Sequence, residues 1–289
     1  MKETELKALV SLLEDDDNDI VDQIERKIIS IGSPIIPFLE EQWERSFNPI
    51  LQKRLEDLIH SMQYDVLRDK LVAWRESGAE DLLEGLYLVA TYQYPDLELE
   101  KLRQDLEQLY YDAWVEFQPE AFHYDQVRIM NSVMFGKLKF SGNTKNFHSP
   151  SNSMIHIVME SRKGNPISLS VIYMLIARKL GMPIYGINLP NLFILTYKTE
   201  ETQFYINPFN RGLIFSREDI QNYVSELQLM PRNSFFEPCS NLEIIQRMLR
   251  NLYVSFEKLG EHYKSEEVKL LLKSISDGNP DYMNDFNTF

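Results

Sequence analysis

The sequence predicts an α+β protein that is predominantly helical. Apolar residues recur at spacings of three and four through residues 1–118, and this period is typical of amphipathic helices. An apolar helix at about 166–180 is followed by candidate strands at 184–188, 192–197 and 203–206, which indicates antiparallel strands beside a buried helix. The helical spacing then returns from residue 241. These three observations together predict the fold class.

The same observations divide the chain into three expected regions. Residues 1–118 form a helical region, 119–235 an α+β core, and 236–289 a helical hairpin with a tail. A prior of roughly 150 residues per domain also favours more than one unit in 289 residues. We expect the tail after Ile275 to be frayed.

Capping residues in the helical region predict where its helices begin and end. Asp17, Asn18 or Asp19 can cap the start of a second helix, and Gly32 can end it. Pro34 favours the start of a third helix. The order helix, acidic turn, helix, Gly-Ser-Pro, helix resembles a HEAT-like unit. The expected helices are 4–13, 20–31, from 34 onward and 49–64, with more from 65 to 118.

The charge is unevenly distributed. The net charge is −14, and residues 1–120 hold 12 basic and 28 acidic residues. Nucleic-acid binding draws most of its affinity from Lys and Arg, so the acidic front half argues against it. The most apolar stretch, 167–176, is about ten residues, whereas a membrane span needs about 20. The residues after Met1 lack the long apolar core of a signal peptide, so we expect none. We therefore expect a cytoplasmic protein that binds neither nucleic acid nor membrane.

Cofactor and metal motifs are absent from the sequence. There is no phosphate-binding glycine-rich motif, and the five histidines lack metal-ligand spacing. The single cysteine, Cys239, excludes an intramolecular disulfide and a cysteine-rich zinc site. We expect no cofactor and no metal.

The expected core has clear local signals. Asn165 is a good N-cap, Pro166 suits the first helical position, and Gly181 suits the end of the helix. The segment 135–153 reads as an ordered loop or short strand with turns. Its polar residues, His148 among them, can hold the loop backbone by hydrogen bonds or contact a ligand.

Four motifs in the order of the chain carry a likeness to a known family. They are Ser-Arg-Lys-Gly-Asn-Pro-Ile-Ser-Leu at 161–169, Ala-Arg-Lys-Leu-Gly-Met-Pro at 177–183, Gly-Ile-Asn-Leu-Pro at 186–190 and Asn-Pro-Phe-Asn-Arg-Gly at 207–212. This stretch resembles the transglutaminase-like superfamily, in particular a bacterial branch with a tetratricopeptide-type C-terminus. The resemblance implies an α+β core of the papain-like cysteine protease type.

The resemblance also implies where a catalytic triad would stand. Active members of the superfamily use Cys, His and Asp, and these positions fall on Pro166, Leu192 and Asn207. Proline has no nucleophile, leucine takes no proton, and an amide does not stabilise an imidazolium as a carboxylate does. The sequence therefore predicts no catalytic residue at these vestigial triad positions.

Other residues are candidates near the same helix. Ser168 and Cys239 are the alternative nucleophiles. The start of the 166–180 helix, with Asn165, Arg162 and Arg211 nearby, is a candidate anion site, because helix N-termini attract negative charge.

Three functions remain open from the sequence. The first is a non-catalytic transglutaminase-like domain between helical arrays, which acts as a protein-interaction or scaffold module with another protein as its partner. The second is a hydrolase or acyl transferase with an atypical nucleophile. The third is a binder of a peptide or small ligand through the vestigial cleft. The sequence predicts no oligomeric state.

Overall fold

The computed structural model describes residues 3–276, so the predicted frayed tail lies outside the described residues. By its contacts the chain divides into two compact units, with the boundary between Lys70 and Leu71. This boundary falls within helix α4 (Pro49–Glu76). The division into regions at 118 and 235 rests on sequence texture and family likeness, and it stays a prediction.

The first unit is helical. It contains α1 (Glu3–Leu12), α2 (Asn18–Ile29), α3 (Ile36–Arg45) and the first part of α4. Asp17 is the residue that caps α2, because its carboxylate accepts a hydrogen bond from the backbone N–H of Asp19 at 2.9 Å. One hydrophobic cluster forms the core of this unit, and its buried residues are Val10, Leu13, Val21, Ile28, Ile35, Leu39, Leu51, Leu55, Leu58 and Met62.

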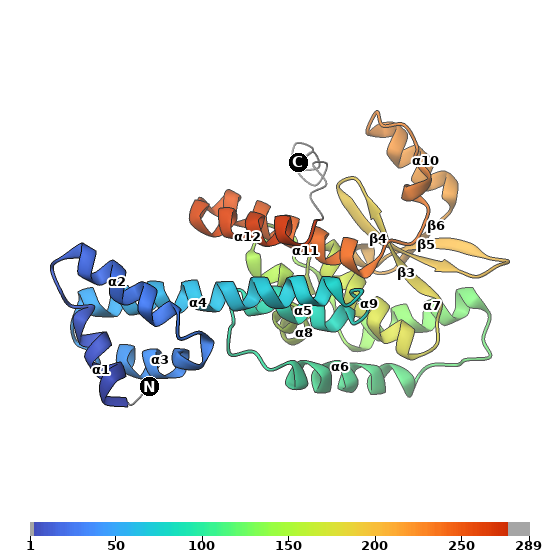
Figure 1. The fold of residues 1–289 in the computed structure, drawn as a ribbon. Helices are drawn as coiled ribbons and strands as arrows, with labels where there is room; N and C mark the ends of the chain where they lie inside the picture. The colour runs from blue at the N-terminus through green and yellow to red at the C-terminus, as the bar shows by residue number, and fades with distance from the viewer. Residues whose placement is uncertain (1–2, 277–289) are drawn as a thin grey trace. The chain divides into compact units, whose positions relative to one another are not determined.

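The second unit combines helices with a four-stranded antiparallel sheet (Figure 1). The strands pair in sequence order and are β3 (Ile184–Leu189), β4 (Leu192–Lys198), β5 (Gln203–Asn207) and β6 (Leu213–Phe215). The helices of this unit are α5 (Leu82–Thr91), α6 (Leu99–Trp114), α7 (His123–Asn131), α8 (Ile155–Ser161), α9 (Pro166–Lys179), α10 (Arg217–Glu226), α11 (Asn241–Leu259) and α12 (His262–Ser274). The predicted helical α+β fold class is confirmed.

Sequence analysis missed two short strands, β6 and β2 (Lys163–Gly164). Strand β1 (Ser141–Gly142) pairs in parallel with β2 and lies within 135–153, where a short strand was one of the expected forms. Two-residue strands carry no alternating pattern, so only the pairing itself defines them. The segment 135–153 also contains the end of a π-helix (Ser132–Lys137) and a 3₁₀ turn (Pro150–Ser153).

Helix α9 is the centre of the second unit. It contacts β3 and β4 of the sheet and also α6, α8 and α11 (Figure 1). Ten of its 14 residues are buried. A helix that is apolar on nearly all sides needs cover on all sides, and here the sheet and the surrounding helices provide it.

The sheet is covered on both faces. The side chains of Ile187 and Ile194 pair across β3 and β4 and pack in one apolar cluster with Ile220 and Val224 of α10. On the opposite face, Phe204 of β5 stacks on Tyr124 of α7 at 4.3 Å between ring centroids. Alternate residues of each strand therefore face α10 on one side of the sheet and α7 on the other.

Helices α11 and α12 form a hairpin, and α11 also packs on α5 and α9. The approach of α11 to α5 is close at Gly85. A Cβ atom there would lie 2.7 Å from Trp74 and 2.8 Å from Ile245. Glycine is therefore the residue that lets these segments pack at this point. The tetratricopeptide-like character of the hairpin and the HEAT-like character of the front helices stay predictions.

Among the described residues 3–276, no helix is both long and apolar enough to span a membrane. The same residues contain no group of three or more His, Cys, Asp or Glu that could hold a metal ion.

Candidate functional site

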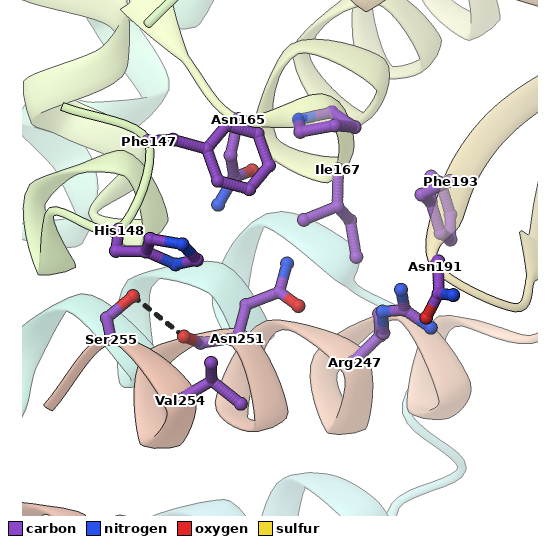
Figure 2. A pocket seen from close by; sticks show the side chains of 11 residues that line it. Phe147, His148, Asn165, Ile167, Asn191, Phe193, Arg247, Asn251, Val254 and Ser255 are labelled. Atoms are coloured by element: carbon purple, nitrogen blue, oxygen red, sulfur yellow. Dashed lines mark hydrogen bonds between the residues drawn. The ribbon is translucent and has the colours of Figure 1, made fainter. Parts of the chain in front are cut away.

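A pocket opens at the start of α9 (Figure 2). Its cavity volume is about 120 Å³. Its walls come from four places in the chain: the loop before the 3₁₀ turn, the first turn of α9, the β3–β4 turn with the start of β4, and one side of α11. The lining residues are Phe147, His148, Asn165, Pro166, Ile167, Asn191, Phe193, Arg247, Asn251, Val254 and Ser255.

The first turn of α9 is held by a reciprocal capping box. The Asn165 side chain accepts a hydrogen bond from the Ser168 backbone N–H at 2.9 Å, and the Ser168 hydroxyl accepts one from the Asn165 backbone N–H at 3.0 Å. Pro166 occupies the first helical position, where its missing N–H removes no helical hydrogen bond. The sequence therefore places Asn165, Pro166 and Ile167 rigidly at the pocket wall.

The loop that carries Phe147 and His148 is fixed by asparagine side chains. Asn152 is buried, and its amide donates to the carbonyl oxygens of Asn146 at 2.8 Å and Phe147 at 2.9 Å. Its own oxygen accepts from Asn143 Nδ2 at 2.8 Å. The asparagines therefore hold the loop backbone, which is one of the two roles that the sequence left open, and Phe147 and His148 line the pocket; ligand contact by this segment stays a prediction.

Helix α11 forms the opposite wall. Asn251, Val254 and Ser255 line the pocket from this helix (Figure 2). The Ser255 hydroxyl donates to the backbone carbonyl of Asn251 at 2.8 Å, one turn earlier in the same helix. Arg247 also lines the pocket, and its Nη1 donates to Asn188 Oδ1 at 3.3 Å and to the Leu189 carbonyl at 3.4 Å, which ties α11 to the end of β3.

The three vestigial triad positions lie in different surroundings. Pro166 lines the pocket. Leu192 is partly buried and packs with the apolar cluster under α10, whereas its neighbour Phe193 lines the pocket. Asn207 ends β5, and its side chain accepts a hydrogen bond from the Asn210 backbone N–H at 3.3 Å. Of the three positions, only Pro166 is among the residues that line this pocket.

The two candidate nucleophiles are not pocket residues. Ser168 is fully buried, and its hydroxyl is engaged in the capping box. Cys239 is a free thiol whose backbone N–H donates to the Gly186 carbonyl at 2.9 Å. Burial, together with the nearby carboxylate of Glu243, raises the pKa of the Cys239 thiol to about 12. A thiol with this pKa is protonated at neutral pH and is a poor nucleophile.

The two arginines of the candidate anion site also lie outside the pocket lining. The Arg162 guanidinium lies over the Phe140 ring, 4.9 Å from its centroid, and burial lowers the pKa of Arg162. Arg211 is exposed and ends the short 3₁₀ turn Pro208–Asn210. The positive charge beside the start of α9 comes instead from Arg247 of α11.

The pocket residues of α11 and of the β3–β4 turn were not candidates in the sequence analysis. One signal for them was available. Arg247 and Arg250 lie among Ile244, Met248 and Leu252, so two arginines interrupt the apolar stripe of a helix. Arginine is almost never fully buried unless it is paired. Two arginines on a core-facing stripe are therefore candidates for a structural tie or a binding site.

Comparisons with known proteins agree with this architecture. Residues 100–250 match the family model of the transglutaminase-like superfamily. The matched range includes β1 to β6, α9 and the first half of α11, and so every residue that lines the pocket except Asn251, Val254 and Ser255. No solved structure matches the chain.

Individual relatives are bacterial and eukaryotic. The chain is 31% identical to a UPF0162 protein of Xylella fastidiosa over 60% of this chain and 63% of the relative. It is 29% identical to a UPF0162 protein of Vibrio cholerae over 50% of this chain and 54% of the relative. It is also 41% identical to F-box only protein 21 of Homo sapiens, over 24% of this chain and 11% of that protein. The chain thus spans less than two thirds of the length of these curated relatives.

Proposed function

Because the chain belongs to the transglutaminase-like superfamily, we propose that it is a member without the thiol chemistry of that fold, and that it acts as a protein-interaction module. In this proposal, a peptide segment of a partner protein occupies the pocket at the start of α9. Other proteins are its partners, with no part for nucleic acid, a membrane or a cofactor.

One observation carries the proposal. The position at which the family resemblance expects the nucleophile is Pro166, and it lies in the wall of the pocket. Ser255 is the only hydroxyl among the lining residues, and it is bonded to a carbonyl of its own helix. A pocket with the location of an active site and no activated nucleophile supports binding rather than turnover.

The lining suits an extended peptide. Asn191 and Asn251 each offer an amide that can both donate and accept hydrogen bonds, as a peptide backbone requires. Phe147, Ile167 and Phe193 offer apolar contact for side chains. Pockets that combine a few polar groups with apolar walls are the usual form of ligand sites.

The flanking regions support a scaffold role. The proposed HEAT-like helices and the proposed tetratricopeptide-like hairpin are both repeat types that bind partners through extended surfaces. The match to F-box only protein 21 covers only 11% of that protein. A segment of this kind within a much longer chain supports the view that it is a module.

A second function has a specific observation in its favour. His148 and Ser255 line the same pocket, where a histidine and a hydroxyl suggest a hydrolase or acyl transferase with an atypical nucleophile (Figure 2). In its present rotamer the Ser255 hydroxyl donates to Asn251 O. Catalysis would require this hydroxyl to donate its proton to His148 instead.

The test is selection of random peptides displayed with their C-termini fused to a carrier protein. We expect the selected peptides to bind the wild-type chain and to lose at least about tenfold in affinity for Val254→Trp, because the indole fills a pocket of about 120 Å³. The control is Val115→Trp, an exposed position just after α6 that does not line the pocket. Equal affinity of the selected peptides for both variants, or failure to select any peptide, would overturn the proposal.

The same peptides distinguish binding from turnover. After prolonged incubation with the chain, we expect mass spectrometry to show the peptides intact. Cleavage or acylation that disappears in both Ser255→Ala and His148→Ala would replace the binding proposal with the second function.

A further inference from the structure

We propose that the first unit carries a docking surface for a basic polypeptide segment of a partner protein. This surface, here called the acidic docking surface, consists of the acidic turn 14–17 between α1 and α2 together with Trp43, Phe47 and Ile50 at the turn from α3 to α4. None of these residues lines the pocket at the start of α9, so the inference goes beyond the proposed function.

The apolar part of the acidic docking surface is the α3–α4 turn. The Phe47 side chain is 99% exposed, Ile50 is 58% exposed and Trp43 is 41% exposed. Single exposed apolar side chains are normal on a protein surface, whereas a group of them marks a place where another molecule binds. Aromatic side chains contribute much of the binding free energy at protein interfaces, so Phe47 is the expected anchor.

Side-chain hydrogen bonds fix the backbone on both sides of Phe47. The Ser46 hydroxyl accepts from the Asn48 backbone N–H at 3.1 Å, and Asn48 Oδ1 accepts from the Ile50 backbone N–H at 3.0 Å. The side-chain amide of Gln52 in α4 donates to the Ser46 carbonyl at 2.9 Å. An ordered turn therefore presents Phe47 to solvent, and little further conformational entropy of this backbone is lost when a partner binds.

The acidic turn lies beside the α3–α4 turn in the first unit (Figure 1). Asn48 Nδ2 donates to Glu14 Oε1 at 3.2 Å. Arg54, near the start of α4, donates through Nη1 to the Leu13 carbonyl and also to the Asp15 carbonyl, the latter at 2.9 Å. These bonds make the acidic turn and the exposed apolar side chains parts of one surface.

The charge of this surface indicates the chemistry of its partner. Residues 14–22 contain six Asp or Glu and no Lys or Arg. Within residues 3–276, which the structure describes, the four carboxylates of the acidic turn form no ion pair. The guanidinium of Arg54 brings one positive charge near them, which leaves negative charge in excess. A segment with Lys or Arg beside an apolar side chain complements both parts of the surface.

The same charges argue against other occupants. The phosphates of nucleic acid or of an anionic membrane surface are repelled by the carboxylates of the acidic turn. A second copy of this chain brings the same excess, because residues 1–70 hold nine basic and 16 acidic residues. The partner is therefore a polypeptide of different composition, with an exposed segment rich in Lys and Arg.

The experiment is a selection of random peptides on the full chain after depletion on the Phe47→Ser variant. Phe47 is almost fully exposed, so this variant keeps the fold, and its melting temperature provides the check. We expect the remaining peptides to carry a net positive charge and at least one apolar residue. Calorimetry should show at least about tenfold weaker binding to Phe47→Ser, and the affinity for the wild type should fall as salt is raised.

Further variants assign the effect to the acidic docking surface. Asp16 is exposed, and Asp17 rather than Asp16 caps α2, so Asp16→Lys keeps the helix start. We expect Asp16→Lys to weaken peptide binding at least about threefold. The matched controls are Phe122→Ser and Asp96→Lys, which make the same types of change at exposed positions of the second unit. Both controls should leave the affinity unchanged.

Four outcomes would overturn the inference. They are the absence of any peptide after depletion, remaining peptides without net positive charge, equal affinity for the wild type and Asp16→Lys, and a dimer of the chain in sedimentation that Phe47→Ser abolishes. The last outcome would make a second copy the occupant. Peptides of this selection should bind Val254→Trp as tightly as the wild type, whereas peptides sensitive to Val254→Trp should bind Phe47→Ser unchanged. Each proposal can therefore fail without the other.

Discussion

Leu192 and Phe193 are consecutive residues of β4, yet they belong to opposite faces of the sheet. Phe193 lines the pocket at the start of α9, and Leu192 packs with Leu189 and Ile194 in the cluster under α10. A side chain at position 192 therefore projects away from the wall formed by Pro166. The residue that stands at the vestigial histidine position is an apolar contact of the α10 cluster.

The first prediction follows from this relationship. We expect Leu192→His to leave the pKa of a cysteine at position 166 unchanged, because the new imidazole would face the α10 cluster. The measurement is the pH dependence of alkylation of Pro166→Cys, alone and combined with Leu192→His. Leu192→His should also lower the free energy of unfolding by about 1–3 kcal/mol, since it brings a polar ring into an apolar cluster. A clear downward shift of the alkylation midpoint in the double variant would contradict the prediction.

The second prediction concerns Cys239. With its pKa raised to about 12, we expect iodoacetamide at pH 8 to label the native thiol far more slowly than the unfolded chain, in which a thiol titrates near pH 8.5. A raised folded-state pKa means that the folded state holds its proton more tightly than the unfolded state. The stability from this group is therefore complete below about pH 8.5 and is lost as the pH rises toward about 12.

The control is Cys239→Ser, which removes this titration. Between those two pH values, the free energy of unfolding should fall more steeply for the wild type than for the variant. Parallel pH profiles of the two proteins would show that the thiol does not titrate as we expect. Peptide binding should be the same in both.

The third prediction compares two buried serines of α9. Ser168 holds the capping box, so we expect Ser168→Ala to lower the free energy of unfolding by up to about 1 kcal/mol and to leave peptide binding intact. Ser170 is equally buried, but within the described residues its hydroxyl has no hydrogen-bond partner. Ser170→Ala should therefore be neutral or stabilising. Urea unfolding of both variants gives the comparison, and loss of peptide binding in a folded Ser168→Ala variant would count against the assigned role.

The fourth prediction concerns Gly212, which follows the vestigial Asn207 motif. Its φ is +74°, and a Cβ atom there would lie 2.0 Å from Asn131 Oδ1. Asn131 Nδ2 also donates to the Gly212 carbonyl at 2.9 Å. Gly212→Ala should therefore lower the free energy of unfolding by more than backbone strain alone would. Gly181 has a similar φ of +77° and open space where a Cβ would lie, so Gly181→Ala should lower the free energy of unfolding by only about 1 kcal/mol. Similar melting temperatures for the two variants would contradict the prediction.

Local sequence signals predicted the helices and most of the sheet. Asp17 and Asn165 cap the helices for which they were candidates, and Pro166 occupies a first helical position. These signals work because a cap or a fixed φ acts within one turn of the chain. The strands at 184–189, 192–198 and 203–207 were found within two residues of their ends, because their apolar runs are bounded by turns. The short β6 has no such run.

Long-range contacts decided the site. His148, Asn165 and Pro166 were candidates from the sequence and line the pocket, whereas Arg162 and Arg211 were candidates that do not. Sequence proximity to the start of α9 did not predict which guanidinium would face it. Arg247, more than 80 residues later in the chain, lies there because α11 packs against α9.

The sequence by itself determined the fold class, the helix starts, the acidic charge and the family, because each depends on composition, local spacing or motif order. Only the tertiary structure decided which side chains share a pocket. The face of β4 on which a residue lies depends on strand register, and a one-residue difference exchanges the two faces, as Leu192 and Phe193 show. Helix α11 forms a wall of the pocket only after its apolar stripe packs on the core. Burial of Ile244, Met248 and Leu252 then also fixes where Arg247 and Arg250 of the same helix lie.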